Sequence, residues 1–562
     1  MEQEDRPSKR VKLSAIDQPE PTEATPTTIA NGLASLHRSV TPPPSSRPRR
    51  ESSVPQTSIQ PAELTSRRPQ LIPSPIQLTH IRDLSAASGN NVDTVRLKDI
   101  LGDPMIRECW QFNFLFDVDF LMSQFDEDVR RLVQVKVVHG SWKKEAPNRI
   151  RIEEACPRYP NVEAITAYMP EPFGTHHSKM MILLRHDDLA QVVIHTANMI
   201  PGDWANMCQA VWRSPLLPLR KTEREPEGPG AIGSGARFKR DLLAYLSEYG
   251  VRKTGPLVRQ LERFDFSAVR AALIASVPSK QRLSSLDSRK KTLWGWPALK
   301  EATQQIPLTP KGKSQTVPSH IVAQISSIAS LGQTDKWLKD VFFASLAPTS
   351  MASTSQPKYS VIFPTPDEIR RSLNGYGSGG SIHMKLQSAT QQKQLQYMRP
   401  YLRHWAGDSN SNSTSIPQRE AGRRRAAPHI KTYIRFSDGE KMDTIDWAMV
   451  TSANLSTQAW GAAVNNVGEV RISSWEIGVM VWPQLFVQGD NTTERPQQAV
   501  MVPCFKRDIP LQLPEDMPGC DVLVGLRMPY DLPLTSYKTD EVPWCATAAH
   551  TEPDWLGQTW EG

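Results

Sequence analysis

The sequence predicts an α/β fold of two similar α/β halves, with an active site at their interface and a disordered N-terminal tail. Three observations support this prediction: a motif that occurs twice, an alternation of strand-like and helix-like segments after Trp110, and an N-terminal region without aromatic residues. From these observations we place the tail at residues 1–75, the first half at residues 76–283 and the second half at residues 284–562.

The tail is predicted from its composition. Aromatic residues make up 7% of the chain, yet the first of them is Trp110, and the region before it is rich in Pro, Ser, Thr and Arg. Such a segment cannot bury enough apolar surface to offset the entropy lost on ordering, so residues 1–75 are predicted to be disordered. Residues 7–13 read Pro-Ser-Lys-Arg-Val-Lys-Leu, which is typical of a nuclear-import signal and predicts a nuclear protein; a solvated charge run is the alternative.

The composition excludes several classes of protein. No stretch approaches the roughly 20 apolar residues that cross a bilayer, and the N-terminus lacks the apolar core of a secretory signal, so no membrane partner is expected. The six cysteines form no CxxC pair and lie at no zinc-ligand spacing with histidine, which predicts free thiols and no metal site. The net charge of +7 permits an anionic partner without identifying one.

Within the two halves, local patterns predict individual elements. Residues 133–138 alternate between apolar and polar and then run apolar, as a partly buried strand does, and residues 238–249 follow a helical pattern. Strands that alternate with helices over about 450 residues predict α/β layers.

One motif occurs in each half and carries the chemistry. Each copy consists of His-x-Lys followed by an apolar run, and then a second apolar run that ends in Ala-Asn. The tripeptide alone is a weak signal, because His383-Met-Lys385 also fits and no strand ending in Ala-Asn follows it. The longer pattern is much more specific, and its polar members are His177, Lys179 and Asn198 in the first half and His429, Lys431 and Asn454 in the second.

The spacing of the motif predicts a shared pocket. Side chains at positions i and i+2 of a strand point to the same face, so each histidine should point the same way as its lysine. If the two asparagines end neighbouring strands, each half directs an imidazole, an ammonium and an amide to one place. Two related halves that face each other would surround a single pocket with two of each group.

This set of groups suits the transfer of a phosphoryl group. Two lysines and two asparagines can donate hydrogen bonds to the non-bridging phosphate oxygens, which carry charge in the transition state. One histidine can attack phosphorus and form a phosphohistidine, while the other protonates the leaving oxygen and later deprotonates water. A lone histidine or lysine would more often be structural or solvated, but the repetition favours catalysis. The residues alone leave open which histidine attacks.

The duplicated pattern resembles the phospholipase D superfamily. Most members carry Asp a few residues after the lysine, whereas this chain has Leu184 and Phe436 at the fifth position. The absence of this Asp is typical of the tyrosyl-DNA phosphodiesterase branch, which the chain resembles from about Trp110 to the C-terminus. The segments that carry the likeness include residues 173–181, 193–198, 428–433, 451–456 and 475–479.

The resemblance implies roles for the catalytic residues. His177 corresponds to the nucleophile, and His429 corresponds to the general acid that later acts as a base. Gln209 and Glu476 correspond to residues that orient the histidines, and which of them serves which histidine stays open. Taken alone, both would be ordinary polar residues.

The resemblance also implies residues that bind the substrate. Phe173, Ser381 and Ser456 correspond to positions near the DNA strand, where an aromatic ring can stack on a base. Without the family, Phe173 would be interpreted as a core residue.

An activity follows from the same resemblance. The enzyme would hydrolyse the bond between a DNA 3′-phosphate and the tyrosine of a stalled topoisomerase I, and would remove other 3′ blocking groups, in DNA repair. It would act as a monomer on single-stranded or frayed 3′ ends, with no metal and no other cofactor. The peptide remnant of topoisomerase I would be its second partner.

Two other interpretations stay open. A different superfamily enzyme, acting on lipid headgroups or as a nuclease, would be expected to carry the Asp after the lysine and a membrane-binding feature. The sequence has neither. In a non-catalytic DNA-binding protein with the same fold, one copy of the motif would be expected to have lost residues, whereas both copies are complete here.

Overall fold

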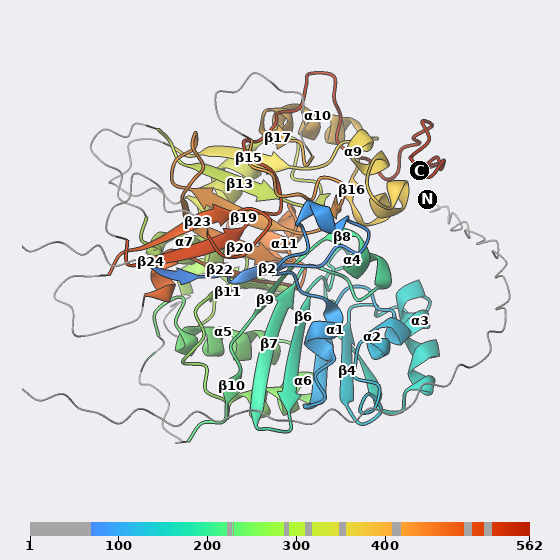
Figure 1. Cartoon of the computed structure of the whole chain (residues 1–562), viewed down its shortest axis with the longest axis vertical. Helices are drawn as coiled ribbons and strands as arrows, with labels where there is room; N and C mark the ends of the chain where they lie inside the picture. The colour runs from blue at the N-terminus through green and yellow to red at the C-terminus, as the bar shows by residue number, and fades with distance from the viewer. Residues whose placement is uncertain are drawn as a thin grey trace, which may run out of the picture. The chain divides into compact units, whose positions relative to one another are not determined.

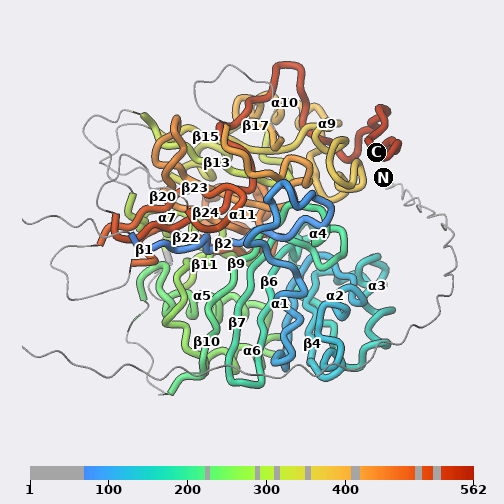
Figure 2. Tube along the Cα trace, viewed as in Figure 1, coloured from blue at the N-terminus to red at the C-terminus, as the bar shows by residue number. Residues whose placement is uncertain are grey.

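The computed structural model describes residues 69–221, 228, 230–285, 291–308, 317–347, 356–406, 418–487, 497–510 and 520–562. Most of the predicted tail, including the basic segment 7–13, lies outside these residues, so the disorder and the nuclear destination stay predictions. Residues 69–75 are described, and the prediction that they belong to a disordered tail is wrong. Strand β1 (Gln70–Ile72) pairs in parallel with the C-terminal strand β24 (Val522–Arg527). In Figure 2 the blue segment of β1 lies beside red segments from the C-terminal part of the chain.

The first sheet contains most strands of the first half. Its central strand β3 runs parallel to β4, which runs parallel to β5, while β6 is antiparallel to both β3 and β7. Residues 133–138 were predicted as a strand, and β4 confirms this. In order across the sheet the strands are β2 (Ile76–Leu78), β9 (Ala210–Arg213), β7 (Leu189–His195), β6 (Met180–Arg185), β3 (Ile106–Phe112), β4 (Gln134–His139) and β5 (Val162–Thr166), with β10 (Leu217–Pro218) paired to β7.

The second sheet repeats this arrangement. Strand β13 runs parallel to β15, which runs parallel to β17, while β19 is antiparallel to both β13 and β20. In order the strands are β1, β24, β23 (Ala499–Cys504), β20 (Ile445–Thr451), β19 (Thr432–Phe436), β13 (His320–Gln324), β15 (Lys358–Ile362) and β17 (Leu402–Arg403), with β22 (Glu476–Val481) on β20 and β11 (Ala272–Ser276) on β22.

The two halves are therefore similar, as predicted. The run β7-β6-β3-β4-β5 of the first sheet matches β20-β19-β13-β15-β17 of the second in order and in direction, and β9 and β22 pair antiparallel to the matching strands β7 and β20. The sheets do not divide the chain cleanly at residue 283, because β11 precedes that residue and joins the second sheet. One hydrophobic core contains buried side chains of both sheets, such as Ile182, Leu273 and Val450.

The helices flank the sheets, with α2 and α3 beside β4 and α5 packed against β11 (Figure 1). Helix α5 confirms the predicted helix at 238–249, and the Ser234 hydroxyl caps it by accepting a hydrogen bond from the Arg237 N–H. The helices are α1 (Leu97–Leu101), α2 (Val118–Ser123), α3 (Pro147–Ala155), α4 (Pro201–Ala205), α5 (Gly235–Ser247), α6 (Val251–Leu261), α7 (Trp296–Gln305), α8 (Ala344–Leu346), α9 (Pro366–Arg370), α10 (Ala389–Met398) and α11 (Thr457–Trp460).

Two further predictions can be compared with this structure. All six cysteines are free thiols, as predicted. Within the described ranges, no helix has the length and apolar character needed to cross a membrane.

Candidate active site

The motif residues gather where strands begin and end. His177 and Lys179 directly precede β6, and His429 and Lys431 directly precede β19. The prediction that each His-x-Lys lies within a strand is therefore wrong by a few residues. The edge is the same, however, because the first residue of β6 lies opposite the last residue of β3, and β19 starts in the same way beside β13.

Each lysine contacts the histidine of its own copy. The Lys179 ammonium donates a hydrogen bond to the His177 carbonyl oxygen at 3.2 Å, and the Lys431 ammonium donates to the His429 carbonyl oxygen at 2.6 Å. Lys431 Nζ also lies 3.3 Å from His429 Nε2. Both lysines are fully buried, whereas the His177 side chain keeps 14% of its surface exposed. The His429 side chain is only 4% exposed, so His177 is the more accessible of the two histidines.

His177 is oriented by the second half. Its Nδ1 lies 3.0 Å from Glu476 Oε2, at the start of β22. The same carboxylate oxygen accepts a hydrogen bond from the Ser452 hydroxyl at 2.5 Å. An ionised carboxylate can only accept hydrogen bonds, so Nδ1 of the imidazole must donate to it and carries the proton. The lone pair of the neutral ring therefore lies on Nε2.

His429 is oriented by the first half. Gln209, the residue before β9, approaches His429 Nδ1 with its Nε2 at 2.9 Å and its Oε1 at 3.3 Å. Asp203 Oδ2 lies 3.2 Å from the same nitrogen and also accepts a hydrogen bond from Gln209 Nε2 at 3.3 Å. The structure thus answers a question that the sequence left open: Glu476 contacts His177, and Gln209 contacts His429.

The two asparagines lie just beyond β7 and β20, and each forms hydrogen bonds with neighbouring residues. Asn454 Oδ1 accepts hydrogen bonds from the main-chain N–H groups of Ser326 and Ser327 at 3.0 and 2.9 Å, so its NH₂ group remains as a donor. The Asn198 N–H donates to Asp203 at 2.6 Å, and among the described residues the Asn198 side-chain oxygen has no hydrogen-bond partner. Both amides thus retain hydrogen-bonding capacity for a ligand.

Burial and mutual repulsion shift the pKa values in the site. Burial, and then the Lys179 ammonium, lower the pKa of His177 to about 4, and burial lowers the pKa of Lys179 to about 8. Burial also lowers the pKa of Lys431 and of His429 well below their usual values, and the charges of Lys179 and His177 add to the effect on His429. Groups from both halves therefore act on one another, and a bound anion would relieve the repulsion among them.

The three residues predicted to lie near the DNA strand are described by their local surroundings. Phe173 is 84% exposed, so its alternative interpretation as a core residue is wrong. Ser381 ends a 3-10 segment (Gly375–Ser381) and is partly exposed. The Ser456 hydroxyl accepts a hydrogen bond from the Ala459 N–H at 3.0 Å and so caps α11. His383, in the third His-x-Lys, was set aside from sequence, yet its charge also lowers the pKa of His429.

Sequence reasoning missed Asp203, although a local signal for its neighbourhood exists. Asn198 and Asn454 are each followed six residues later by a tryptophan whose indole N–H donates to the asparagine carbonyl oxygen at 3.0 Å. This repeat marks the segments after both asparagines as parts of the duplication, and Asp203 belongs to one of them. The second copy has Ala459 in its place, so the comparison of the two motifs gave no reason to select it.

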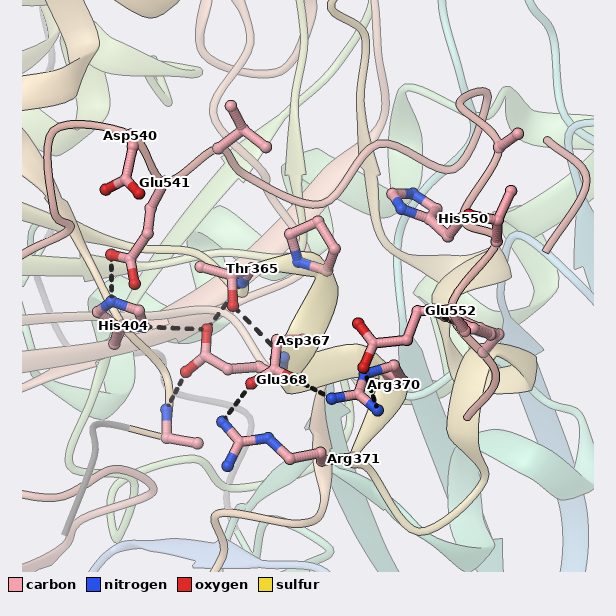
Figure 3. A pocket seen from close by; sticks show the side chains of 16 residues that line it. Thr365, Asp367, Glu368, Arg370, Arg371, His404, Asp540, Glu541, His550 and Glu552 are labelled. Carbon is pink, nitrogen blue, oxygen red and sulfur yellow. Dashed lines mark hydrogen bonds and ion pairs between the residues drawn. The ribbon is translucent and has the colours of Figure 1, made fainter. Parts of the chain in front are cut away.

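Two cavities lie apart from the motif residues. One, of about 800 Å³, lies beside the start of α5. The other, of about 460 Å³, contains an ion-pair cluster in which His404 bridges Glu368 and Glu541 (Figure 3). Burial opposes the charge of His404, but the two carboxylates raise its pKa to about 9. Neither cavity is lined by the two histidines of the motif. Across the described residues, no group of three or more His, Cys, Asp or Glu side chains could hold a metal ion.

Asp203→Asn should remove a pH dependence of stability. Burial raises the pKa of Asp203 from 3.8 to about 6, so its contribution to stability is complete below pH 4 and is lost as the pH rises through 6. At about 1.4 kcal/mol per pKa unit, the loss is on the order of 3 kcal/mol. As the pH rises across this range, the free energy of unfolding of the wild type should fall by this amount relative to that of the variant. Urea unfolding of both proteins at both ends of the range measures this difference. An unchanged difference would contradict the shift.

Comparisons with known proteins point to one family. The family model described as tyrosyl-DNA phosphodiesterase matches residues 75–538. A probable tyrosyl-DNA phosphodiesterase of Schizosaccharomyces pombe is 32% identical over 555 residues, which cover 87% of this chain and 96% of that protein. Tyrosyl-DNA phosphodiesterase 1 of Drosophila melanogaster is 30% identical over 461 residues, which cover 80% and 70% of the two chains.

A solved structure shows the same fold. The crystal structure of the yeast tyrosyl-DNA phosphodiesterase aligns with a TM-score of 0.56 at 22% identity, over 84% of this chain and 98% of that one. Because the family model spans most of the sequence and the relatives are matched over most of their length, the chain belongs to the tyrosyl-DNA phosphodiesterase family.

Proposed function

We propose that this DNA phosphodiesterase hydrolyses the 3′-phosphotyrosyl bond that joins DNA to a stalled topoisomerase I. Hydrolysis proceeds through a phosphohistidine on His177 and needs no metal ion. The names of the relatives support the substrate class, and the paired histidines support the two-step mechanism. Other 3′ adducts, action as a monomer and a nuclear destination stay predictions.

The contact between His177 and Glu476 carries the proposal. Because Glu476 holds the proton on Nδ1, the lone pair of Nε2 is available to attack phosphorus. A P–N bond forms, the bond between phosphorus and the tyrosyl oxygen breaks, and its electron pair leaves with that oxygen. The low pKa of His177, about 4, keeps this ring neutral at physiological pH.

His429 is suited to move a proton in both directions. As an imidazolium it gives its Nε2 proton to the leaving tyrosyl oxygen, while Asp203 and the Gln209 oxygen accept a hydrogen bond from Nδ1. As a neutral ring it takes a proton from water, which attacks phosphorus, breaks the P–N bond and leaves a DNA 3′-phosphate. In both states Nδ1 keeps its proton, because the proton moves on and off Nε2 alone, so the Gln209 and Asp203 oxygens can accept from Nδ1 throughout the reaction.

The lysines and asparagines hold the phosphate. Two ammonium groups and the Asn454 NH₂ group can donate to the non-bridging oxygens, and one fixed donor of this kind is worth about 2.7–4 kcal/mol in a transition state. The negative phosphodiester would also raise the pKa of both lysines and of His429, which charges the donors and the acid when substrate arrives.

Turnover in EDTA tests the activity. A single-stranded oligonucleotide with a 3′-phosphotyrosine should be converted to the 3′-phosphate in excess EDTA at the rate seen without it, which gel electrophoresis measures. A phospholipid with a choline headgroup should release no choline under the same conditions. Failure of the oligonucleotide reaction, together with release from the lipid, would reject the proposal.

Substitution of the two histidines tests their roles. His429→Ala should slow the second step by about 10²–10⁴, because water loses its base, so a covalent protein–DNA adduct should accumulate on denaturing gels. His177→Ala should form no adduct. His186→Ala, which changes an exposed histidine beyond the far end of β6, should behave as the wild type. An adduct that survives His177→Ala and disappears with His429→Ala would reverse the two roles.

A further inference from the structure

Three parallel strands of the first sheet end at the edge where His177 lies, and an exposed aromatic side chain follows each of them. Phe114 follows β3, Trp142 follows β4 and Tyr168 follows β5. Their exposed fractions are 38%, 54% and 66%. Because these strands are neighbours about 4.8 Å apart, the three residues lie at the same edge of the sheet, and we call this set the aromatic row.

The aromatic row begins at the active site. The ring of Phe114 lies 5.5 Å from the imidazole of His177, measured between centroids. At the other end, the indole N–H of Trp475 donates to the Tyr168 carbonyl oxygen at 3.2 Å, and the Trp475 carbonyl oxygen accepts from the His177 N–H at 2.9 Å. Both Phe114 and Tyr168 are therefore linked by direct contacts to the segment that carries His177.

The matching edge of the second half is covered by the C-terminal segment. The Trp544 N–H donates to the Pro364 carbonyl oxygen just after β15, and the His404 N–H donates to the Thr535 carbonyl oxygen just after β17, both at 2.9 Å. The ion pair of His404 with Glu541 holds the same cover in place (Figure 3). The C-terminal segment thus covers this edge of the second sheet, whereas the aromatic row at the matching edge of the first sheet is exposed.

The charge beside the aromatic row favours an anionic partner. The Lys143 ammonium lies 5.6 Å from the centre of the Trp142 ring. Lys144 is also exposed, and Glu145 is the one acidic residue in this stretch after β4. Aromatic faces beside lysines suit a single nucleic-acid strand, because bases stack on the rings and phosphates meet the ammonium groups.

We propose that Trp142 and Tyr168 bind bases of the DNA strand that leads to the active site. This inference rests on the proposed function and extends it from the scissile bond to the path of the strand. A row of rings on adjacent strands can take successive bases, as RNA-binding sheets do. Loss of one stacked base weakens binding by about 5- to 150-fold.

The test compares substrates of two lengths. One is a strand of about ten nucleotides with a 3′-phosphotyrosine, long enough to cover such a surface, and the other is a single nucleotide with the same group. The variant Trp142→Ala/Tyr168→Ala should raise KM for the long substrate by at least about fivefold and leave kcat unchanged. KM for the single nucleotide should stay as in the wild type. Trp142→Phe/Tyr168→Phe should restore KM, because the rings remain.

Controls separate this inference from the proposed function. Leu132→Ala changes a residue that is 72% exposed beyond the opposite end of β4, and it should alter neither KM. Unchanged KM values in the double alanine variant would overturn the inference while leaving the function intact. A KM that depends on the length of the attached peptide, and not on the length of the DNA, would assign the row to the protein remnant and also overturn it. Absence of turnover by the wild type would instead reject the proposed function.

Discussion

The site depends on one constraint: each catalytic imidazole is held by a side chain from the other half of the molecule. Glu476 reaches His177 and Gln209 reaches His429, and both orienting residues stand at matching places, at or just before the start of strands that pair with β20 and β7. Neither half could complete a site alone. The shared hydrophobic core, in which both sheets participate, keeps these contacts in register.

Duplication provides two sets of histidine, lysine and asparagine side chains. Departures from symmetry give the two histidines different surroundings. A carboxylate alone contacts Nδ1 of His177, whereas an amide and the Asp203 carboxylate together contact Nδ1 of His429. The same contrast appears at the outer edges of the sheets. The C-terminal segment covers the edge of the second half, and the first half leaves its aromatic side chains exposed.

Much of this could be predicted from sequence because the signals are local. The alternation in residues 133–138 predicts β4, and the duplicated motif selects histidines and lysines whose charges act on one another. Contacts across the seam could not be predicted in this way. Glu476 lies far along the chain from His177, and no periodicity records which distant strand brings the two together. The same holds for β1, whose partner β24 lies at the other end of the chain.

The rates of the two chemical steps in variants of the orienting residues show whether each residue acts through its own histidine. Rapid-quench kinetics with a 3′-p-nitrophenyl phosphate substrate would separate them, because this leaving group needs no proton. Glu476→Gln should slow formation of the covalent adduct and spare its hydrolysis, while Gln209→Leu should slow hydrolysis and spare formation. If both variants slowed the same step to the same extent, the orienting contacts would not act through separate histidines, and the account would be wrong.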